Sequence, residues 1–384
     1  MRLFRIRIFQ PVILEYRRGL YAGLWKRYGD RIEVWAAESL GVDKSVPLEG
    51  IATDYGHNFV RIGPFLWQRG LTLKGLAKGD VLVVCGELRQ LSSLWYAACA
   101  RLRGIRVVWW GHHASANAKE YKVRIRIWIA KWLSDVFLTY TEVGVSYLAN
   151  RGYPKDRIFA TGNTIDTKCV ASAIDSLMLK RGSGESRLDS FKQERGFAGK
   201  HVLLFCGKLR EKVQLGVLLN ALSLLKDKRS DWHCIIIGDG EMTEHWKASC
   251  KELGLESYTT WTGEILDQEE LAPWFLSADI FVYPGRIGLS LIHAFSYGLP
   301  VILNDNPQDH GPEYVVFKPG ENGIAFKYMD YSDLASKIDE SLGNPKIREL
   351  GANGKELVYC EYSMEKMVLR YSAAVEAAAK DLKQ

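Results

Sequence analysis

The stretch that decides the fold is YPGRIGLSLIHAFSYGLPVILNDNPQDHGPEYV, which spans residues 283–315. An apolar strand ends just inside it, and a loop with two glycines leads to an apolar helix that a further glycine and a proline terminate. A helix approached through glycines leaves its first backbone N–H groups accessible to phosphate oxygens. The pattern therefore predicts a strand, an anion-binding turn at Gly288, Leu289 and Ser290, and a helix.

Short apolar strands alternate with longer amphipathic helices on both sides of this stretch. The first half of the chain contains the apolar runs LFRIRIF, IEVWAA, DVLVVCGE, IRVVWWG and VFLTYTE. The second half contains HVLLFCG, WHCIIIGDGE, YTTWTGEI, DIFVYPG and PVILND. This alternation is typical of parallel α/β sheets, and we predict two Rossmann-like halves in which ligands bind at the carboxyl ends of the strands.

The length and one polar segment predict the domain organisation. A chain of 384 residues is long for a single core, since domains usually hold about 100–200 residues. The polar segment LKRGSGESRLDSFKQERGFAGK is typical of a connection between domains. We expect an N-terminal domain over residues 1–180, a second domain over residues 181–365, and a helix over residues 366–384 that packs across the back of the domains.

The cysteines and the apolar runs bear on the location of the protein. The seven cysteines are scattered and include no C-x-x-C pair, which favours reduced thiols in a cytosolic protein over a zinc site or a disulfide framework. The N-terminal apolar run is interrupted by arginines, and no stretch reaches the roughly 18 uncharged apolar residues of a membrane span. We expect a cytoplasmic protein, either soluble or peripheral on the inner face of the cell membrane.

The charge is distributed unevenly. Residues 1–180 carry 27 Lys and Arg against 15 Asp and Glu, whereas the remainder carries 24 against 30. A basic first half predicts an anionic partner, and an anionic membrane surface is favoured because no nucleic-acid-binding signature is present. The segment KVRIRIWIAKWL, residues 122–133, places cations beside tryptophans, which suits docking to such a surface. A packed domain helix with snorkelling arginines is the alternative.

Two further features could bind a phosphorylated ligand. A strand ends at Gly207, and Lys208 and Lys212 follow it, so these cations could neutralise a diphosphate; a solvated basic loop is the alternative. Glu313 could accept hydrogen bonds from the hydroxyls of a ribose or a sugar, or it could be a capping or surface carboxylate. The GDGE turn at residues 238–241 does not complete the dinucleotide fingerprint, and we interpret it as a tight turn.

The order of these elements resembles the donor domain of retaining glycosyltransferases of the GT-B fold, family 4 in particular. The matching segments are GKLREK (207–212), GDGE (238–241), WTGEI (261–265), ADIFVYP (278–284), GLPV (298–301), HGPE (310–313) and PGENG (319–323). In the first half, residues 140–166 resemble the boundary segment of the family. The resemblance covers most of the chain and is weakest before residue 80.

The resemblance implies a structure and an activity. The structure would be two Rossmann-like domains that face each other across a cleft, with a C-terminal helix crossing back. The activity would be transfer of a sugar, with retention, from a nucleotide-diphosphate sugar to a glycan or lipid-linked glycan, in bacterial surface polysaccharide synthesis. The donor site would include Gly207, Lys208, Lys212 and Glu313, together with the turn at residues 288–290. The fold is usually independent of metals, so we expect neither a metal nor another cofactor.

The chain departs from the family at a pair of glutamates that are usually eight positions apart around the glycine loop. His293 stands in the second position, and no acid fills the first. The chain looks like a subgroup with the signature G-L-S-x-I-H-A, and His293 is assigned to the donor pocket. A helix histidine satisfied by local contacts is the alternative.

Further candidates follow strands of the first half. Family members place a histidine after the strand that IRVVWW matches, where it touches the donor sugar, so His112 or His113 is expected at the reaction centre. We favour His112, which directly follows a glycine, although a histidine there could also be only a polar cap. Glu15, Tyr16 and Arg17 follow the first strand and could bind an acceptor diphosphate. A basic first turn of a surface helix would look the same in sequence.

The reaction and its alternatives complete the prediction. The sequence offers no carboxylate pair of the glycosidase type, so the resemblance implies same-face attack assisted by the departing phosphate. A nucleotide-sugar 2-epimerase shares the two-domain architecture but normally needs catalytic carboxylates in the cleft. A non-catalytic protein that binds nucleotide sugars is the other alternative, because the usual glutamate pair is absent. The sequence identifies neither the donor base and sugar nor the acceptor.

Overall fold

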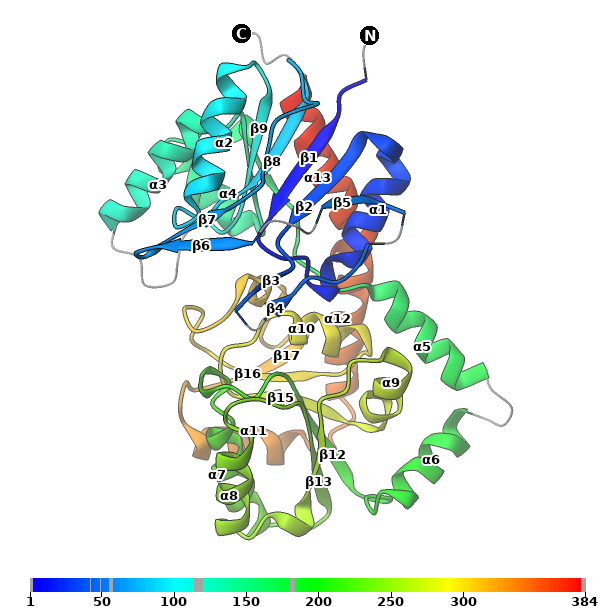
Figure 1. Cartoon of the computed structure of the whole chain (residues 1–384). Coiled ribbons are helices and arrows are strands. Elements are labelled where there is room, and N and C mark those ends of the chain that lie inside the picture. The colour runs from blue at the N-terminus through cyan, green and yellow to red at the C-terminus, as the bar shows by residue number, and fades with distance from the viewer. Residues whose placement is uncertain are drawn as a thin grey trace. The chain divides into compact units, whose positions relative to one another are not determined.

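The computed structural model describes residues 3–380, apart from residues 42, 49, 55–57, 114–119 and 180–183. The chain forms two compact units: unit 1 consists of Met1–Ile165 with Met364–Gln384, and unit 2 of Asp166–Ser363 (Figure 1). Each unit is built on its own parallel sheet with helices on both faces, which confirms the predicted fold class. The division falls before helix α5 (Thr167–Leu179), whereas the boundary predicted at residue 180 follows that helix.

Unit 1 contains a seven-stranded parallel sheet in the order β11-β10-β9-β8-β1-β2-β5. The strands are β1 (Ile6–Gln10), β2 (Ile32–Ala36), β5 (Ala52–Asp54), β8 (Val81–Cys85), β9 (Arg106–Trp110), β10 (Val136–Thr139) and β11 (Ile158–Ala160). The helices are α1 (Arg18–Tyr28), α2 (Leu91–Leu102), α3 (Glu120–Leu133) and α4 (Glu142–Ala149). Two short antiparallel pairs join β3 (Ser39–Leu40) to β4 (Asp43–Lys44) and β6 (Phe59–Ile62) to β7 (Phe65–Gln68). The chain leaves β1 towards β2 and returns to β8 on the other side, so the strand order reverses between β1 and β8.

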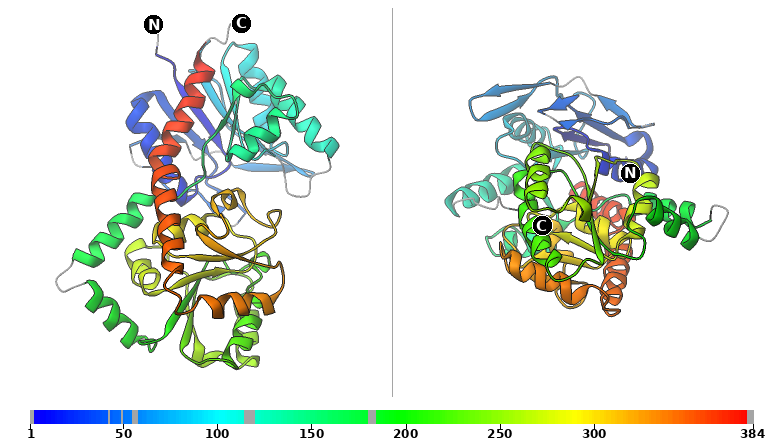
Figure 2. Two further views of the ribbon diagram at one scale, coloured as in Figure 1. Left: turned by 180° about the vertical axis from the view of Figure 1, so that it is seen from behind. Right: turned by 90° about the horizontal axis from the view of Figure 1, so that it is seen from below.

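The last helix, α13 (Met364–Ala379), belongs to unit 1 and packs against α1 and the strands β8 to β11. Figure 2 shows it from behind as a straight red helix. Its buried residues recur every three or four positions, so one side of the helix is apolar. Tyr371 is completely buried, and its ring meets that of Trp110 edge-on at 5.0 Å. The predicted C-terminal helix is thus part of the core of unit 1.

Unit 2 contains a six-stranded parallel sheet in the order β14-β13-β12-β15-β16-β17. The strands are β12 (His201–Cys206), β13 (Trp232–Ile237), β14 (Thr259–Gly263), β15 (Ile280–Tyr283), β16 (Val301–Asn304) and β17 (Gly323–Phe326). The helices are α5, α6 (Gly184–Glu194), α7 (Leu215–Lys226), α8 (Thr243–Glu252), α9 (Gln268–Ser277), α10 (Leu289–Ser296), α11 (Tyr331–Ser341) and α12 (Ile347–Glu361). The central strands are buried on both faces, which explains their continuous apolar sequences. The strand order reverses between β12 and β15.

Candidate functional site

The carboxyl ends of β12 and β15 bring the glycine turns of unit 2 together. Gly207 follows β12, and a Cβ placed on it would lie 3.0 Å from the hydroxyl oxygen of Tyr283 at the end of β15. A Cβ on Gly285 would lie 2.5 Å from the carbonyl oxygen of Lys212. The backbone N–H of Arg286 donates to that same oxygen at 2.9 Å. The two loops therefore pack backbone against backbone, at the point where the strand order reverses and where open α/β sheets bind ligands.

The segment HGPE fixes the loop between β15 and α10. The backbone N–H of Ile287 donates to Nδ1 of His310 at 3.4 Å, and the N–H of Gly311 donates to the Ile287 carbonyl at 2.7 Å. Nε2 of His310 lies 3.0 Å from the carbonyl oxygen of Asn304 at the end of β16. Because Nδ1 accepts, the proton of a neutral ring is on Nε2 and donates to Asn304. Burial lowers the pKa of His310, which favours this neutral form.

Helix α10 begins at Gly288 directly after this loop. Its N-cap residue, Gly288, has no side chain with which to cap the first turn, as is usual where a helix N-terminus meets an anion. The loop and helix confirm the predicted order of strand, glycine turn and helix. Glu313 is only 5% exposed, and its Oε2 lies 3.6 Å from the position that a Cβ on Gly288 would take. The carboxylate thus lies beside the start of α10 and is not a surface group.

Three cations gather at the same end of unit 2. Burial, and then the neighbouring Arg210 and Arg286, lower the pKa of Lys212, and only Glu241 opposes this shift. In the part of the chain that the structure describes, none of these three cations forms an ion pair with a carboxylate. Lys208 is exposed on the same loop. We call Arg210, Lys212 and Arg286 the basic cluster; no ion pair within the described chain neutralises its positive charge.

Arg286 is a residue that the sequence analysis missed. It directly follows Gly285, in the loop between β15 and α10. A charged residue inside a glycine-rich turn that leads to a helix was the available signal.

His293 lies on α10 but faces α9 and not the basic cluster. Its Nε2 lies 2.9 Å from Oε1 of Gln268, and its ring contacts Phe275 with ring centres 4.5 Å apart. Burial lowers the pKa of His293 to about 4, so the ring is neutral at physiological pH. These contacts are those of a histidine satisfied locally, and the role of His293 in the donor pocket stays a prediction.

A cavity of about 200 Å³ lies in unit 1 where its own strand order reverses, at the carboxyl ends of β1, β8 and β9. Arg17 lines it and donates to Oε1 of Gln10 at 3.0 Å and to the hydroxyl of Tyr140 at 2.9 Å. Its guanidinium also stacks over the ring of Trp110, 4.3 Å from the ring centre. Among the described residues these partners are neutral and no carboxylate pairs with Arg17. An anionic ligand in the cavity would therefore meet an uncompensated guanidinium.

The structure distinguishes the two candidate histidines. His112 is exposed, lines this cavity, and lies 4.6 Å from Tyr140 between ring centres. His113 is half-buried, and its ring lies 5.0 Å from that of Tyr147 on α4. Burial, and then Arg126 and Arg151, lower the pKa of His113. His112 is thus the member of the pair that a ligand in the cavity could reach.

Only one of the three predicted acceptor residues lines this cavity. Arg17 does so, whereas Glu15 is exposed and pairs with Arg18 at 3.1 Å. The ring centre of Tyr16 lies 5.5 Å from the Arg17 guanidinium. Glu15 therefore fits the alternative interpretation, the first turn of a surface helix, whereas Arg17 does not.

No metal site is evident in the described ranges, where His, Cys, Asp and Glu do not gather in groups of three or more that could hold a metal ion.

Comparison with known proteins assigns unit 2. Residues 186–357 match the family described as "Glycosyl transferases group 1". This segment resembles a glycosyltransferase domain. It contains the basic cluster, α10 and Glu313, so the predicted donor residues all lie within the matched segment.

Several glycosyltransferases resemble the chain over most of its length. EpsD of Bacillus subtilis (strain 168), which is provisionally named a glycosyltransferase, is 24% identical over 297 residues, 73% of each chain. The lipopolysaccharide 1,6-galactosyltransferase of Escherichia coli (strain K12) is 23% identical over 309 residues, 76% of this chain and 75% of that protein. The matched domain and these relatives together support an enzyme of the glycosyltransferase class.

Solved structures share the fold. HepE of Anabaena, crystallised with UDP, aligns with a TM-score of 0.72 and 14% identity over 98% of this chain and all of that chain. A glycosyltransferase from Rickettsia africae ESF-5 aligns with a TM-score of 0.73 and 14% identity over 99% of this chain and 100% of its own. At such identities the likeness shows the GT-B architecture of two Rossmann-like domains, as the sequence predicted.

Proposed function

We propose that the chain transfers a hexosyl group from a UDP-hexose to a glycan or lipid-linked glycan acceptor, with retention, in the synthesis of a bacterial surface polysaccharide. The observation that carries this proposal is the basic cluster together with the glycine N-cap of α10 on the neighbouring loop. Negative charge grows on the diphosphate as the glycosyl bond breaks. Fixed cations and backbone N–H groups at this place would stabilise that charge in the transition state.

The relatives support the choice of donor. HepE binds UDP in one crystal structure and UDP-glucose in another, and the relative from Escherichia coli is named a galactosyltransferase. These facts concern those proteins. We extend them to this chain as a proposal because the basic cluster and the start of α10 lie within the matched segment.

Each donor residue receives a role in this proposal. Lys208 and Lys212 would be counter-charges for the diphosphate, joined by Arg286. The backbone of residues 288–290 would bind phosphate oxygens, and Gly207 would let the ligand approach the end of β12. Glu313 would accept hydrogen bonds from ribose or sugar hydroxyls, and His293 would line the donor pocket. The neutralising charge comes from these side chains, so we propose a reaction that needs no metal ion.

For unit 1 we propose that His112 contacts the reacting sugar and that Arg17 binds an anionic group of the acceptor. Retention would follow from same-face attack, in which the departing phosphate takes the proton of the acceptor hydroxyl. The anomeric configuration of the product, read by NMR, checks this: an inverted product would exclude same-face attack.

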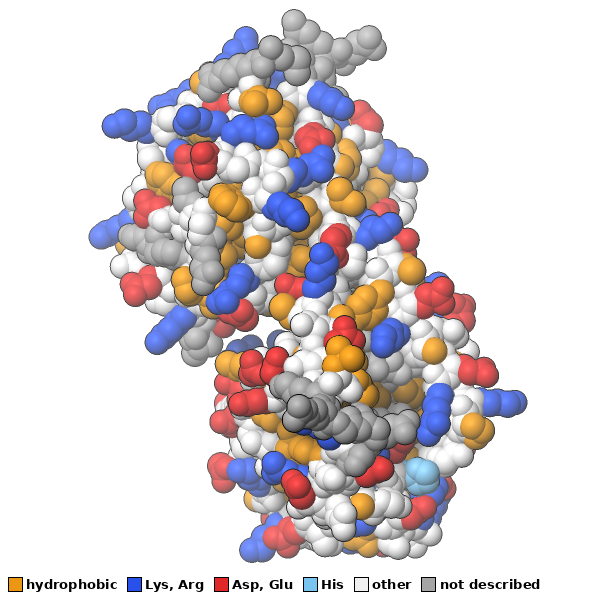
Figure 3. Space-filling view, turned by 90° about the vertical axis from the view of Figure 1, so that its right-hand side faces the viewer, with side chains coloured by type: hydrophobic (Ala, Val, Ile, Leu, Met, Phe, Trp, Pro, Cys, Tyr) orange, Lys and Arg blue, Asp and Glu red, His pale blue; other side chains and the backbone are white. Residues whose placement is uncertain are grey.

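We also propose a peripheral position at the cytoplasmic face of an anionic membrane. The charge of the first half supports it, and Figure 3 shows Lys and Arg side chains spread over one face of unit 1. None of the described helices is long and apolar enough to cross a bilayer. A lipid-diphosphate-linked glycan would be an acceptor that such a position makes accessible.

Thermal unfolding in the presence of UDP-, GDP-, dTDP- and ADP-linked sugars tests the donor site, because a ligand that binds only the folded state raises its stability. We expect a shift with UDP-hexoses that Lys212→Ala removes and that Lys251→Ala, at an exposed lysine of unit 2, retains. A shift with another nucleotide would reassign the base, and no shift with any would contradict the proposed function. Release of an epimerised UDP-sugar without acceptor would favour the 2-epimerase.

A further inference from the structure

Helix α3 of unit 1 exposes an aromatic and aliphatic stripe. Tyr121, Ile125, Trp128 and Trp132 are spaced by four, three and four residues, so they lie on one side of the helix. They are 57%, 50%, 62% and 65% exposed, and no other described tryptophan is as exposed as the last two. The rings of Trp128 and Trp132 lie 6.2 Å apart between centres. Large apolar side chains gathered in this way on the surface mark an interaction site.

Cations flank this stripe. Lys122, Arg124 and Lys131 are exposed on the same helix, and within the described chain none of them has an ion-pair partner. Tryptophan and tyrosine rings favour the headgroup level of a bilayer, while cations beside them meet lipid phosphates. Three unpaired cations beside the stripe match an anionic lipid surface better than an apolar protein surface.

The opposite face of α3 is packed into unit 1. Val123, Ile127 and Ala130 are buried in the core, and Arg126 is buried with them. The two interpretations that the sequence left open thus apply to different faces of one helix. The packed face holds the helix in the core of unit 1. The exposed stripe is therefore not needed to attach the helix to the unit.

Arg126 connects α3 to the cavity of unit 1. Its Nη2 donates to the carbonyl oxygen of Gly86 at 2.8 Å and lies 3.7 Å from Oε1 of Glu87, which lines the cavity. The helix that presents the stripe is therefore tied by a buried guanidinium to the edge of the sheet where Arg17 and His112 lie. A surface bound by the stripe would lie on the same unit as the proposed acceptor site.

We propose that the outer face of α3 docks unit 1 on an anionic bilayer, with Trp128 and Trp132 at headgroup level and the three flanking cations on lipid phosphates. This inference names the membrane partner of the proposed transferase. Only the link to a lipid-linked acceptor rests on the proposed function. The docking itself requires nothing but the helix and the lipid.

Sedimentation with vesicles tests the docking. Full-length protein is mixed at low salt with vesicles of phosphatidylcholine, with or without phosphatidylglycerol. We expect binding to the anionic vesicles only. Trp128→Ala with Trp132→Ala should weaken it at least tenfold, because both side chains leave the interface. The control, Leu266→Ala with Leu369→Ala, removes two exposed apolar side chains that lie outside α3 and should bind like the wild type.

A second variant tests the charges without touching the tryptophans. Replacing Lys122, Arg124 and Lys131 by Gln should weaken binding on the order of 100-fold, since each cation near such a surface is worth about a factor of five. Replacing Lys228, Lys251 and Lys346 of unit 2 by Gln changes the net charge equally and should have a much smaller effect. Unfolding curves confirm that each variant folds.

The outcomes separate this inference from the proposed function. Equal binding of the α3 variants and the wild type, or no binding of the wild type to anionic vesicles, would overturn the docking proposal whatever the donor assay shows. If UDP-hexoses do not shift the thermal unfolding of the wild type, the proposed function is overturned, and the vesicle result is unaffected. Quenching of tryptophan fluorescence by brominated lipids checks which rings reach the bilayer. We expect the double variant Trp128→Phe and Trp132→Phe to lose this quenching; quenching that persists unchanged in it would show that other tryptophans insert.

Discussion

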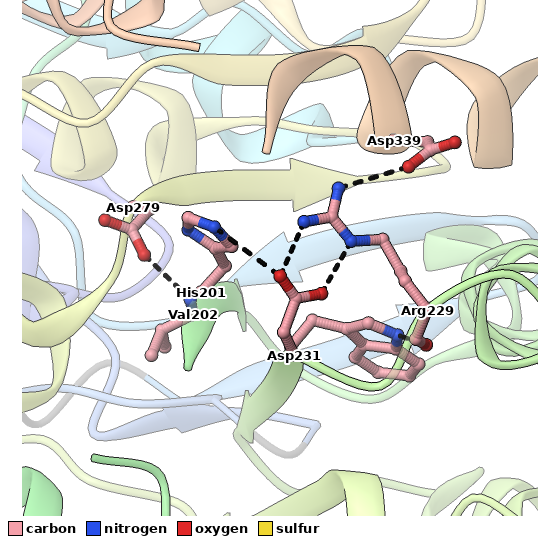
Figure 4. A network of polar contacts seen from close by, with 7 residues as sticks. His201, Val202, Arg229, Asp231, Asp279 and Asp339 are labelled. Atoms are coloured by element: carbon pink, nitrogen blue, oxygen red, sulfur yellow. Dashed lines mark hydrogen bonds and ion pairs between the residues drawn. The ribbon is translucent and has the colours of Figure 1, made fainter. Parts of the chain in front are cut away.

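The two ends of the sheet in unit 2 differ in how their charged side chains are paired. At the amino end, Arg229 donates from Nε to Asp231 at 2.6 Å and from Nη1 to Asp339 at 3.2 Å (Figure 4). The carboxylate of Asp279 accepts the backbone N–H of Val202 at 2.8 Å. Hydrogen bonding from Arg229 lowers the pKa of Asp231 to about 2. Arg229 thus forms ion pairs with two carboxylates, and the polar contacts of this network connect the starts of β12, β13 and β15 with α11.

At the carboxyl end, three cations lie close together, and within the described residues none of them forms an ion pair. Arg210 and Arg286 reinforce the effect of burial and lower the pKa of Lys212, so the folded chain holds like charges together. Such an arrangement opposes folding and is relieved when an anion binds. A hollow of about 570 Å³ lies at the amino end of this sheet, where His201 and Asp279 line it. We therefore use the unpaired cations, and not the volume of a hollow, to place the proposed donor site at the carboxyl end.

The largest effect is expected from removing the central cation. Lys212→Ala should lower kcat/KM for sugar transfer about 100-fold, because a fixed charge aimed at the leaving diphosphate is lost. Steady-state rates with UDP-hexose measure this. Lys251→Ala, which removes an exposed lysine of the same unit, is the control and should keep its activity. Equal activity of Lys212→Ala and the wild type would remove the basic cluster from the mechanism.

A smaller effect is expected at the residue that the sequence did not reveal. Arg286→Gln should weaken UDP-hexose binding about tenfold, the usual cost of losing a hydrogen bond to a charged group. It should also make the pKa of Lys212 rise towards that of ordinary lysine, because one repelling neighbour is gone. Calorimetric titration gives the affinity. If the variant binds the donor as tightly as the wild type, Arg286 contacts no phosphate.

The pH dependence of donor binding sharpens the comparison further. The pKa of Lys212 is lowered in the free protein, and a bound diphosphate would raise it. Donor affinity should therefore be complete below the pKa of the free protein and decline above it, at a lower pH than an ordinary lysine would give. Lys212→Arg keeps the charge and should remove this decline, whereas titration of the nucleotide base affects both proteins alike. Identical profiles of the two proteins would show that Lys212 does not meet the diphosphate.

The smallest effect is expected at the amino end. Asp231→Asn should lower the free energy of unfolding by no more than about 1 kcal/mol, because exposed ion pairs contribute little. Since the pKa of Asp231 is lowered to about 2, this contribution is complete above a pH of about 4 and is lost as the pH falls towards 2. Chemical denaturation at neutral and acid pH measures it. A large loss of donor affinity in this variant would contradict the division of roles between the two ends.

The fold could be predicted because the apolar strands are continuous in the sequence and glycine turns follow them. The sequence could not show that α13 belongs to unit 1, since a helix with an apolar stripe does not reveal which core it completes. Nor could it show that α5 is part of unit 2. Residues 167–179 form an ordinary amphipathic helix, and the polar segment after it looked like the boundary.

The sequence predicted those site residues whose position depends on the backbone alone. It was less informative where the role of a residue depends on the direction of its side chain. Gly207, Lys212 and the start of α10 follow from their place after strands. The choice between His112 and His113 depends on which side of the chain each ring takes, which a sequence leaves open. The contact between His293 and Gln268 joins two helices 25 positions apart, and no local pattern signals it.

The most direct test of the account compares the two ends of unit 2 in one calorimetric titration with UDP. The account predicts that Lys212→Gln weakens UDP binding about 100-fold, whereas Arg229→Gln, which removes the cation of the paired network, leaves the affinity unchanged. Loss of UDP binding in Arg229→Gln with full binding in Lys212→Gln would contradict it and would place the donor at the other end of the sheet.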